Sequence, residues 1–156
     1  LKWFVEDGTL CKGLDKFNLN FDELKFIKAS TKSFMHMPIN MGSVMTKTFG
    51  AIQGAKAETT EQYLILSKDI SSWKSDHYFL VASDVPGYES LSLKGNYYAK
   101  VYDGAFKDLP KWMNEFEELL KSRGYSSHDM MAFYTTCPKC AIHYGHNYIV
   151  LFSKVS

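Results

Sequence analysis

The feature that most constrains the fold of this chain is an internal repeat of a strand, a polar turn and a helix. Residues 34–45 follow this order, and residues 99–110 follow it again 65 positions later. Each helical segment is followed by two short apolar runs of strand length. Two β-α-β-β halves of this kind form one antiparallel sheet with both helices on one side, because each helix has a single apolar stripe to bury. We therefore predict an α+β fold.

Two segments predict the helices. Asn40 offers a side-chain cap for the first helix, and Gly54 ends it. The second begins at Asp108 with a proline in its first turn and ends at Gly124. Apolar residues at helical spacing define the buried stripes, at Met41, Val44, Met45, Phe49 and Ile52 in the first helix and at Leu109, Trp112, Met113, Phe116, Leu119 and Leu120 in the second.

The remaining segments predict strands and loops. We expect the first 24 residues to form an irregular arm and residues 25–156 to form the domain. The stretch 25–37, which Pro38 closes, reads as a strand or a bent pair of strands. Further strands are expected at 61–67, 77–83, 90–104, 130–135 and 147–154, with a polar connecting loop between 61–67 and 77–83.

Composition excludes several classes of function. With 18 basic and 17 acidic residues the formal net charge is +1, too small for a field that holds nucleic acid or an anionic membrane. No apolar run approaches the roughly 20 residues that span a bilayer. The three cysteines are an odd number in a chain too large to depend on disulfides, which favours a reducing compartment. We expect a cytoplasmic protein, and composition does not predict its oligomeric state.

Aromatic residues make up 15% of the chain, which favours an aromatic-lined pocket. Trp73 lies in a polar segment, where a large ring tucks under its loop or covers a pocket mouth. The other candidate ligand contacts are Tyr98, Tyr102, Phe133 and Tyr134. The alternative is that these aromatic residues belong to an ordinary β-rich core.

The segment before the last strand contains a cluster of metal-ligand types. Cys137, Cys140, His143 and His146 form C-x2-C-x2-H-x2-H, and Cys11 is a further candidate ligand. The spacing is shorter than that of known two-half zinc sites, so we expect no cofactor and keep zinc as the alternative. A redox pair of the two neighbouring cysteines is a second alternative, and a tight structural loop is a third.

Four segments together resemble the GyrI-like, effector-binding (SHS2-type) domains. They are residues 92–125, MHMPINMGSV at 35–44, the SSW segment ending at Trp73, and TTCPKCAIHYGHNYIVLF at 135–152. The last three are similar to a bacterial branch that is sometimes labelled hydrolase. The resemblance covers nearly the whole chain and implies an α+β domain that binds hydrophobic, often cationic, small molecules. Some relatives are drug-sensing modules and some hydrolyse cyclopropane-bearing toxins.

Two departures from the family pattern bear on function. Drug-binding relatives place a Glu in the last strand, whereas NYIVLFSKV has no acidic residue, which leaves Glu89 as the nearest acidic candidate. The family pattern CPKCAKKYGKNY has lysines where this chain has His143 and His146.

A hydrolase needs an activated nucleophile and a base within hydrogen-bond reach, and His36 and Tyr98 are the candidate catalytic residues.

The sequence therefore predicts a domain that binds a mostly apolar ligand, neutral or cationic, in a groove between its two halves. A hydrolase acting on a small hydrophobic or toxin-like molecule is the alternative function. A structural or partner-binding protein without a ligand is the third.

Overall fold

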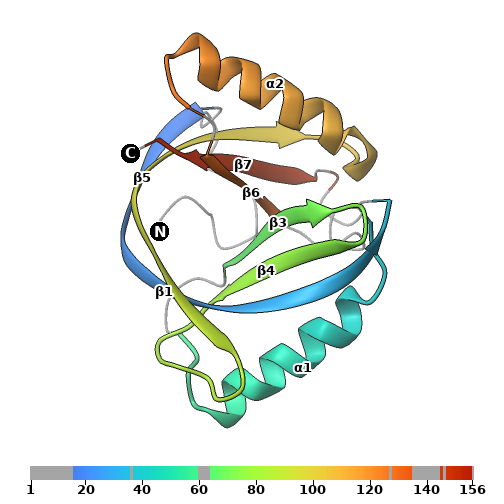
Figure 1. The fold of residues 1–156 in the computed structure, drawn as a ribbon, viewed down its shortest axis with the longest axis vertical. Coiled ribbons are helices and arrows are strands. Elements are labelled where there is room, and N and C mark those ends of the chain that lie inside the picture. Colours follow the sequence, from blue (N-terminus) through green and yellow to red (C-terminus); the bar gives the residue numbers. More distant parts are fainter. Residues whose placement is uncertain are drawn as a thin grey trace. The chain divides into compact units, whose positions relative to one another are not determined.

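The computed structural model describes residues 16–35, 37–59, 64–126, 128–134, 145 and 147–155. Its fold is α+β, as predicted, with antiparallel strands and two α-helices (Figure 1). The elements follow in this order: β1 (Lys16–Phe34), β2 (Met37–Pro38), α1 (Met41–Gly54), β3 (Ile65–Ser71), β4 (Lys74–Leu80), β5 (Glu89–Asp103), the 3-10 helix η1 (Phe106–Asp108), α2 (Leu109–Ser122), β6 (His128–Tyr134) and β7 (Tyr148–Lys154).

The chain divides into two compact units. The α1 unit is Phe21–Lys94, and the α2 unit is Leu1–Asn20 together with Gly95–Ser156. The long strands β1 and β5 contribute residues to both. Strands of the α1 unit lie in the order β2-β1-β4-β3, and those of the α2 unit in the order β6-β7-β5, with antiparallel neighbours throughout.

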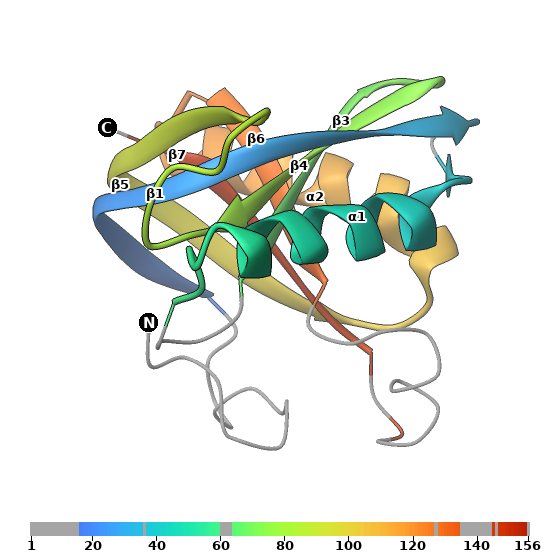
Figure 2. The ribbon, with the colours of Figure 1, turned by 90° about the horizontal axis from the view of Figure 1, so that it is seen from below.

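Helix α1 covers one face of its sheet (Figure 2). Side chains alternate between the two faces of a strand, so Ile27 on β1 and Phe79 on β4 face the helix together. Phe49 meets Phe79 edge to face, with ring centroids 5.5 Å apart. The core of this unit consists of Ile27, Ala29, Ile52, Ala57, Ile65, Phe79, Val81 and Val85, against which Val44, Met45, Phe49 and Tyr88 pack.

Helix α2 packs on the β5 and β7 strands of its own unit. Phe116 and Leu120, one turn apart on the helix, are fully buried, and Trp112 is 9% exposed. The Tyr102 ring stacks on Trp112 at 5.3 Å. The core of this unit consists of Tyr98, Tyr102, Trp112, Phe116, Leu120, Ala132, Ile149 and Leu151.

The structure corrects two predictions. The expected irregular arm, residues 1–24, overlaps β1, which begins at Lys16; residues 1–15 lie outside the described part of the chain. Residues 16–22 alternate polar and apolar types, the pattern of a strand. The loop expected between the strands at 61–67 and 77–83 is instead a hairpin whose turn is Ser72–Trp73. The strands extend through polar residues because backbone pairing between strands does not need apolar side chains.

Both helices begin and end close to the predicted positions. Asn40 occupies the N-cap of α1, but its side chain does not cap the helix. The Asn40 Oδ1 atom instead accepts a hydrogen bond from the Lys32 backbone N–H at 2.8 Å. This contact ties the start of α1 to the end of β1.

Candidate functional site

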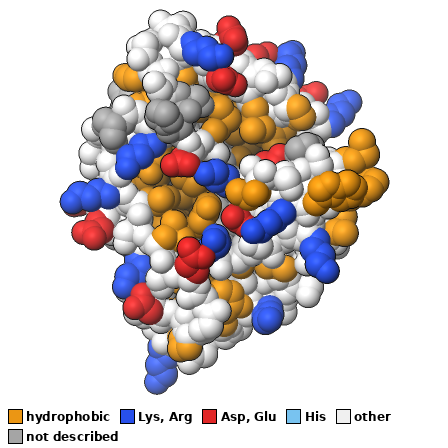
Figure 3. All heavy atoms as spheres, viewed as in Figure 1, with side chains coloured by type: hydrophobic (Ala, Val, Ile, Leu, Met, Phe, Trp, Pro, Cys, Tyr) orange, Lys and Arg blue, Asp and Glu red, His pale blue; other side chains and the backbone are white. Residues whose placement is uncertain are grey.

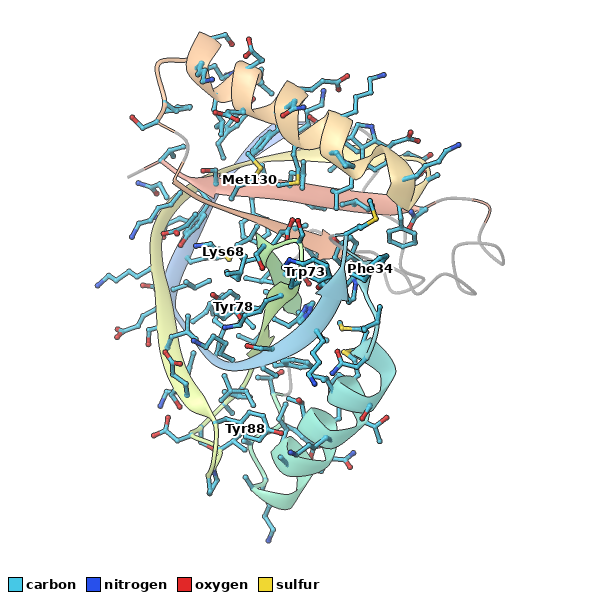
Figure 4. The ribbon with its side chains drawn as sticks, turned by 45° about the vertical axis from the view of Figure 1, so that its right-hand side comes forward. Phe34, Lys68, Trp73, Tyr78, Tyr88 and Met130 are labelled. Carbon is cyan, nitrogen blue, oxygen red and sulfur yellow. The ribbon has the colours of Figure 1, made fainter. Side chains whose placement is uncertain are left out.

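Five large apolar side chains are exposed at one end of the α1 unit, and we call them the apolar tip. They are Phe34, Met35, Ile39, Ile70 and Trp73, with exposed fractions of 55, 70, 68, 46 and 64%. Rings of Phe34 and Trp73 meet edge to face, with centroids 5.8 Å apart (Figure 4). Single exposed apolar residues are common, but a contiguous group marks a binding surface or an interface.

Backbone hydrogen bonds hold the segments that carry the tip. The Ser33 N–H donates to the Trp73 carbonyl oxygen at 2.7 Å, which joins the end of β1 to the β3–β4 turn. The Ile39 N–H donates to the Lys32 carbonyl at 2.9 Å, and the Trp73 N–H donates to Ser71 Oγ at 3.2 Å. These hydrogen bonds therefore hold the backbone of the segments that carry Phe34 and Trp73 in a fixed register.

The sheet face turned away from α1 carries charged and hydroxyl groups. Lys28, Ser30 and Lys32 on β1 lie directly opposite Tyr78, Asp76 and Lys74 on β4, and Lys68 on β3 lies opposite Asp76. Figure 4 labels Lys68 and Tyr78 on their neighbouring strands.

Hydrogen bonds and ion pairs link part of this face. Ser30 Oγ donates to Asp76 Oδ1 at 2.6 Å, and Lys74 Nζ lies 3.6 Å from the same oxygen. Lys28 Nζ pairs with Glu89 at 2.7 Å, and the hydrogen bond to Glu89 raises the pKa of Lys28.

Opposite this face, under α1, lies a buried ladder of polar side chains. His77 is 1% exposed and bridges two strands: its Nδ1 lies 2.8 Å from Ser67 Oγ on β3, and its Nε2 lies 2.8 Å from Thr31 Oγ1 on β1. Ser75 and Ser33 continue the ladder through an Oγ–Oγ contact of 3.1 Å. Burial lowers the pKa of His77 from 6.5 to about 4, against a smaller opposing effect of Asp76. His77 is therefore neutral at pH 7.

The hydroxyl partners determine which ring nitrogen of His77 carries the proton. Thr31 Oγ1 donates to the Ser75 carbonyl oxygen at 3.5 Å, so its only proton is used there. The Thr31 oxygen must then accept from His77 Nε2–H, which leaves Nδ1 to accept from the Ser67 hydroxyl. The ladder thus runs from Ser67 through His77 and Thr31 to the Ser75 carbonyl oxygen.

The tyrosines of the α2 unit are buried against α2. Tyr98 is 3% exposed; its ring stacks on Phe116 at 6.3 Å, and the Arg123 guanidinium lies 4.9 Å from its centroid. Its hydroxyl is buried and has no hydrogen-bond partner among the described residues. Lys100 Nζ lies 4.9 Å from the Tyr102 ring.

The predicted ligand contacts fall in three different environments. Trp73 is at the exposed tip, and Glu89 is exposed and bonded to Lys28. Tyr98, Tyr102 and Tyr134 come together in the core beneath α2. Phe133 is 3% exposed and, as a neighbour of Tyr134 on β6, points to the other face of that strand. The predicted catalytic role of Tyr98 and the predicted groove stay predictions.

The predicted metal ligands fall outside the described part of the chain, and so does His36, one of the two predicted catalytic residues. These residues are His36, Cys11, Cys137, Cys140, His143 and His146. Among the residues that are described, no group of three or more His, Cys, Asp or Glu side chains could hold a metal ion. The zinc and redox alternatives therefore stay untested.

Sequence reasoning missed Phe34, the lysines beside it and the His77 ladder. The alternation along β1 indicates which face of the strand carries Phe34, but only the strand pairing shows that the Phe34 ring meets Trp73. His77 begins an apolar run in the sequence, and its hydroxyl partners Ser67 on β3 and Thr31 on β1 lie 10 and 46 positions away from it in the chain. No local signal predicts that ladder.

A family model described as "Bacterial hydrolase" matches residues 10–155. No curated protein matches the chain. Within the described residues, neither helix has the length and hydrophobicity needed to cross a membrane.

Solved structures share the fold at low sequence identity. A hydrolase from Listeria innocua is 11% identical over 91% of this chain and 92% of its own, with a TM-score of 0.62. The EcmrR C-terminal domain is 11% identical over 90% and 96%, with a TM-score of 0.64. The protein SAV2435 bound to tetraphenylphosphonium is 10% identical over 92% and 94%, with a TM-score of 0.53.

Proposed function

The chain belongs to the bacterial hydrolase family, and from this premise we propose that it binds an apolar small molecule through the aromatic pair Phe34 and Trp73. The observation that carries the proposal is the exposure of this pair within the apolar tip. Exposed aromatic rings that are already ordered lose little conformational entropy on binding, so they are efficient contact surfaces. The short hydrogen bond from Ser33 to Trp73 supports such ordering.

A protein of the same fold supports the class of ligand. SAV2435 was solved with tetraphenylphosphonium, a molecule made mostly of aromatic rings. Because only the fold is shared at 10% identity, the likeness supports an apolar ligand and not a particular residue. The exposed aromatic pair is the feature of this chain that such a ligand would contact.

Replacement of both tip rings is expected to weaken ligand binding at least about tenfold. The probe is N-phenyl-1-naphthylamine, a neutral aromatic dye whose fluorescence rises in apolar surroundings. Loss of part of the contact with two rings costs about 1.4 kcal/mol or more, which corresponds to a factor of about ten in Kd. The measurement is a fluorescence titration of wild type and of the double variant Phe34→Ala, Trp73→Ala.

The control is Lys111→Ala, which shortens an exposed side chain of α2. Circular dichroism and melting temperature establish that each variant is folded. Equal affinity of the double variant and wild type for the dye would place binding elsewhere. No binding by wild type would remove the proposed function.

Hydrolysis of the bound molecule is the second candidate function, and the family description favours it. Ser67 and His77 lie within hydrogen-bond distance, but both are at least nine-tenths buried beneath α1. They are better explained as structural groups than as a nucleophile and its base. A reaction is expected to depend on His36, which lies outside the described residues, or on Tyr98, whose buried hydroxyl has no hydrogen-bond partner among them.

Turnover is tested by incubating the protein with ester and amide derivatives of bound aromatic compounds. Product is followed by mass spectrometry. If the chain is a hydrolase, product forms with wild type, and His36→Ala or Tyr98→Phe lowers the rate at least about a hundredfold, the usual contribution of an acid–base group. Product that forms equally with both variants would exclude these residues.

We further propose that the two compact units are the two halves of the internal repeat. Each has one helix followed in sequence by two antiparallel strands: α1, β3 and β4 in one, and α2, β6 and β7 in the other. We also propose the cytoplasmic location that the composition of the chain predicts.

A further inference from the structure

We infer that the molecule bound at the apolar tip is an anion, namely an aromatic or aliphatic body that carries a carboxylate, sulfonate or similar group. This inference rests on the proposed function, because it specifies the ligand of the same surface. It follows from the charges that the strand pairing places beside Phe34 and Trp73.

Two lysines lie next to the tip and directly opposite each other. The β1–β4 register pairs Lys32 with Lys74, so both side chains project from the same face. Both residues are exposed. Phe34 lies two residues beyond Lys32 on the same face of β1, and Lys74 follows Trp73 in the chain. The aromatic pair and the two ammonium groups thus share one end of the sheet.

Like charges that face each other across a strand pair are unfavourable. Among the described residues Lys32 has no ion pair, and Lys74 has Asp76 at 3.6 Å. Asp76 also accepts the 2.6 Å hydrogen bond from Ser30. A negative group placed between Lys32 and Lys74 would relieve their repulsion, whereas a cation would add to it.

Counted together with Lys32 and Lys74, the charges of this sheet face are positive overall. Lys28 and Lys68 add two positive charges, so four lysines stand against the two carboxylates Asp76 and Glu89, a net of +2. Asp69 is the remaining acidic residue of the hairpin. Asp69 lies opposite Ser75, so the Asp69 side chain leaves its strand on the sheet face that carries the His77 ladder and not on the face of the lysines.

Hydrophobic side chains project beyond the end of β1 and the β3–β4 hairpin, and Lys and Arg side chains surround them (Figure 3). The apolar body of a ligand would pack on the rings, and its anionic group would reach the lysine pair. Such a ligand has the charge opposite to the cation that the family resemblance implies.

Two probes of nearly equal size and shape and opposite charge test the inference. Tetraphenylborate and tetraphenylphosphonium are titrated by calorimetry in sodium buffer without potassium or ammonium, which would precipitate the borate. Wild type is expected to bind tetraphenylborate at least about tenfold more tightly. The double variant Lys32→Glu, Lys74→Glu is expected to lose this preference or to reverse it.

The matched control is Lys107→Glu, Lys111→Glu, which changes net charge equally at two exposed lysines of the α2 unit. It is expected to keep the preference for the borate. Equal binding of both probes by wild type, or an equal loss of preference in the control, would overturn the inference. If the neutral dye binds while the charged probes are not distinguished, only the charge of the ligand is wrong. Binding of none of the three contradicts the proposed function itself.

Discussion

Acidification from about pH 7.5 to about pH 4.5 is expected to lower the free energy of unfolding by roughly 2–3 kcal/mol through His77 alone. Burial lowers the pKa of this imidazole from 6.5 to about 4 in the folded protein. The unfolded chain therefore binds the proton first. Stabilisation by neutral His77 is complete above pH 6.5 and is lost as the pH falls from 6.5 towards 4.

The structural reason is the direction of the hydrogen-bonded ladder. Protonation would turn His77 Nδ1 from an acceptor into a donor, so the Ser67 hydroxyl would have to rotate and place its own proton elsewhere. The charged ring would also be desolvated, with only Asp76 nearby to offset the cost. Both effects oppose protonation in the folded state.

His77→Gln is the variant that isolates this effect. Glutamine does not titrate in this range, and its amide keeps one donor and one acceptor between the strands. Urea unfolding at several pH values gives the free energies of both proteins, and their difference removes the contribution of every other group. The variant is expected to be less stable at pH 7.5 and to depend less on pH. An unchanged pH dependence would show that His77 is not the titrating group.

Carboxylates contribute in a separate range of pH. Hydrogen bonds from Lys25 and Ser90 lower the pKa of Asp84 below 3.8, so its stabilising contribution is lost only at more acidic pH than that of His77. Asp84 is fully exposed, and its ion pair with Lys25 is screened by water. Asp84 therefore contributes little to the change in stability between pH 6.5 and 4.

Phe116→Ala is expected to lower the free energy of unfolding by about 3–5 kcal/mol. Phe116 is fully buried at the centre of α2, and its ring stacks on Tyr98 with an interplanar angle of 7°. Removal of the ring leaves a cavity in the core that Tyr98 and Leu120 line. Since neighbouring backbone cannot close such a space, the lost contacts are not recovered.

Glu118→Ala, at an exposed position of the same helix, is the matched control. It is expected to change stability by less than about 0.5 kcal/mol. The measurement is urea unfolding of the three proteins, followed by circular dichroism. A loss below about 1 kcal/mol for Phe116→Ala would mean that α2 does not depend on this contact.

Local sequence pattern predicted the two helices closely. Gly54 ends α1 and Gly124 follows the end of α2, and the buried stripe of α2 contains the predicted Trp112, Phe116 and Leu120. These features depend on residues a few positions apart, so a single segment contains the information.

The sequence by itself thus determined the α+β class and the helices, because the helical period is a property of one segment. Strand pairing decided the rest. Lys32 and Lys74 are 42 positions apart in the chain and become direct neighbours only in the β1–β4 register. Ser67, His77 and Thr31 likewise form a ladder only when three strands align. Which side chains meet across a sheet depends on register, which many weak contacts along both strands set together.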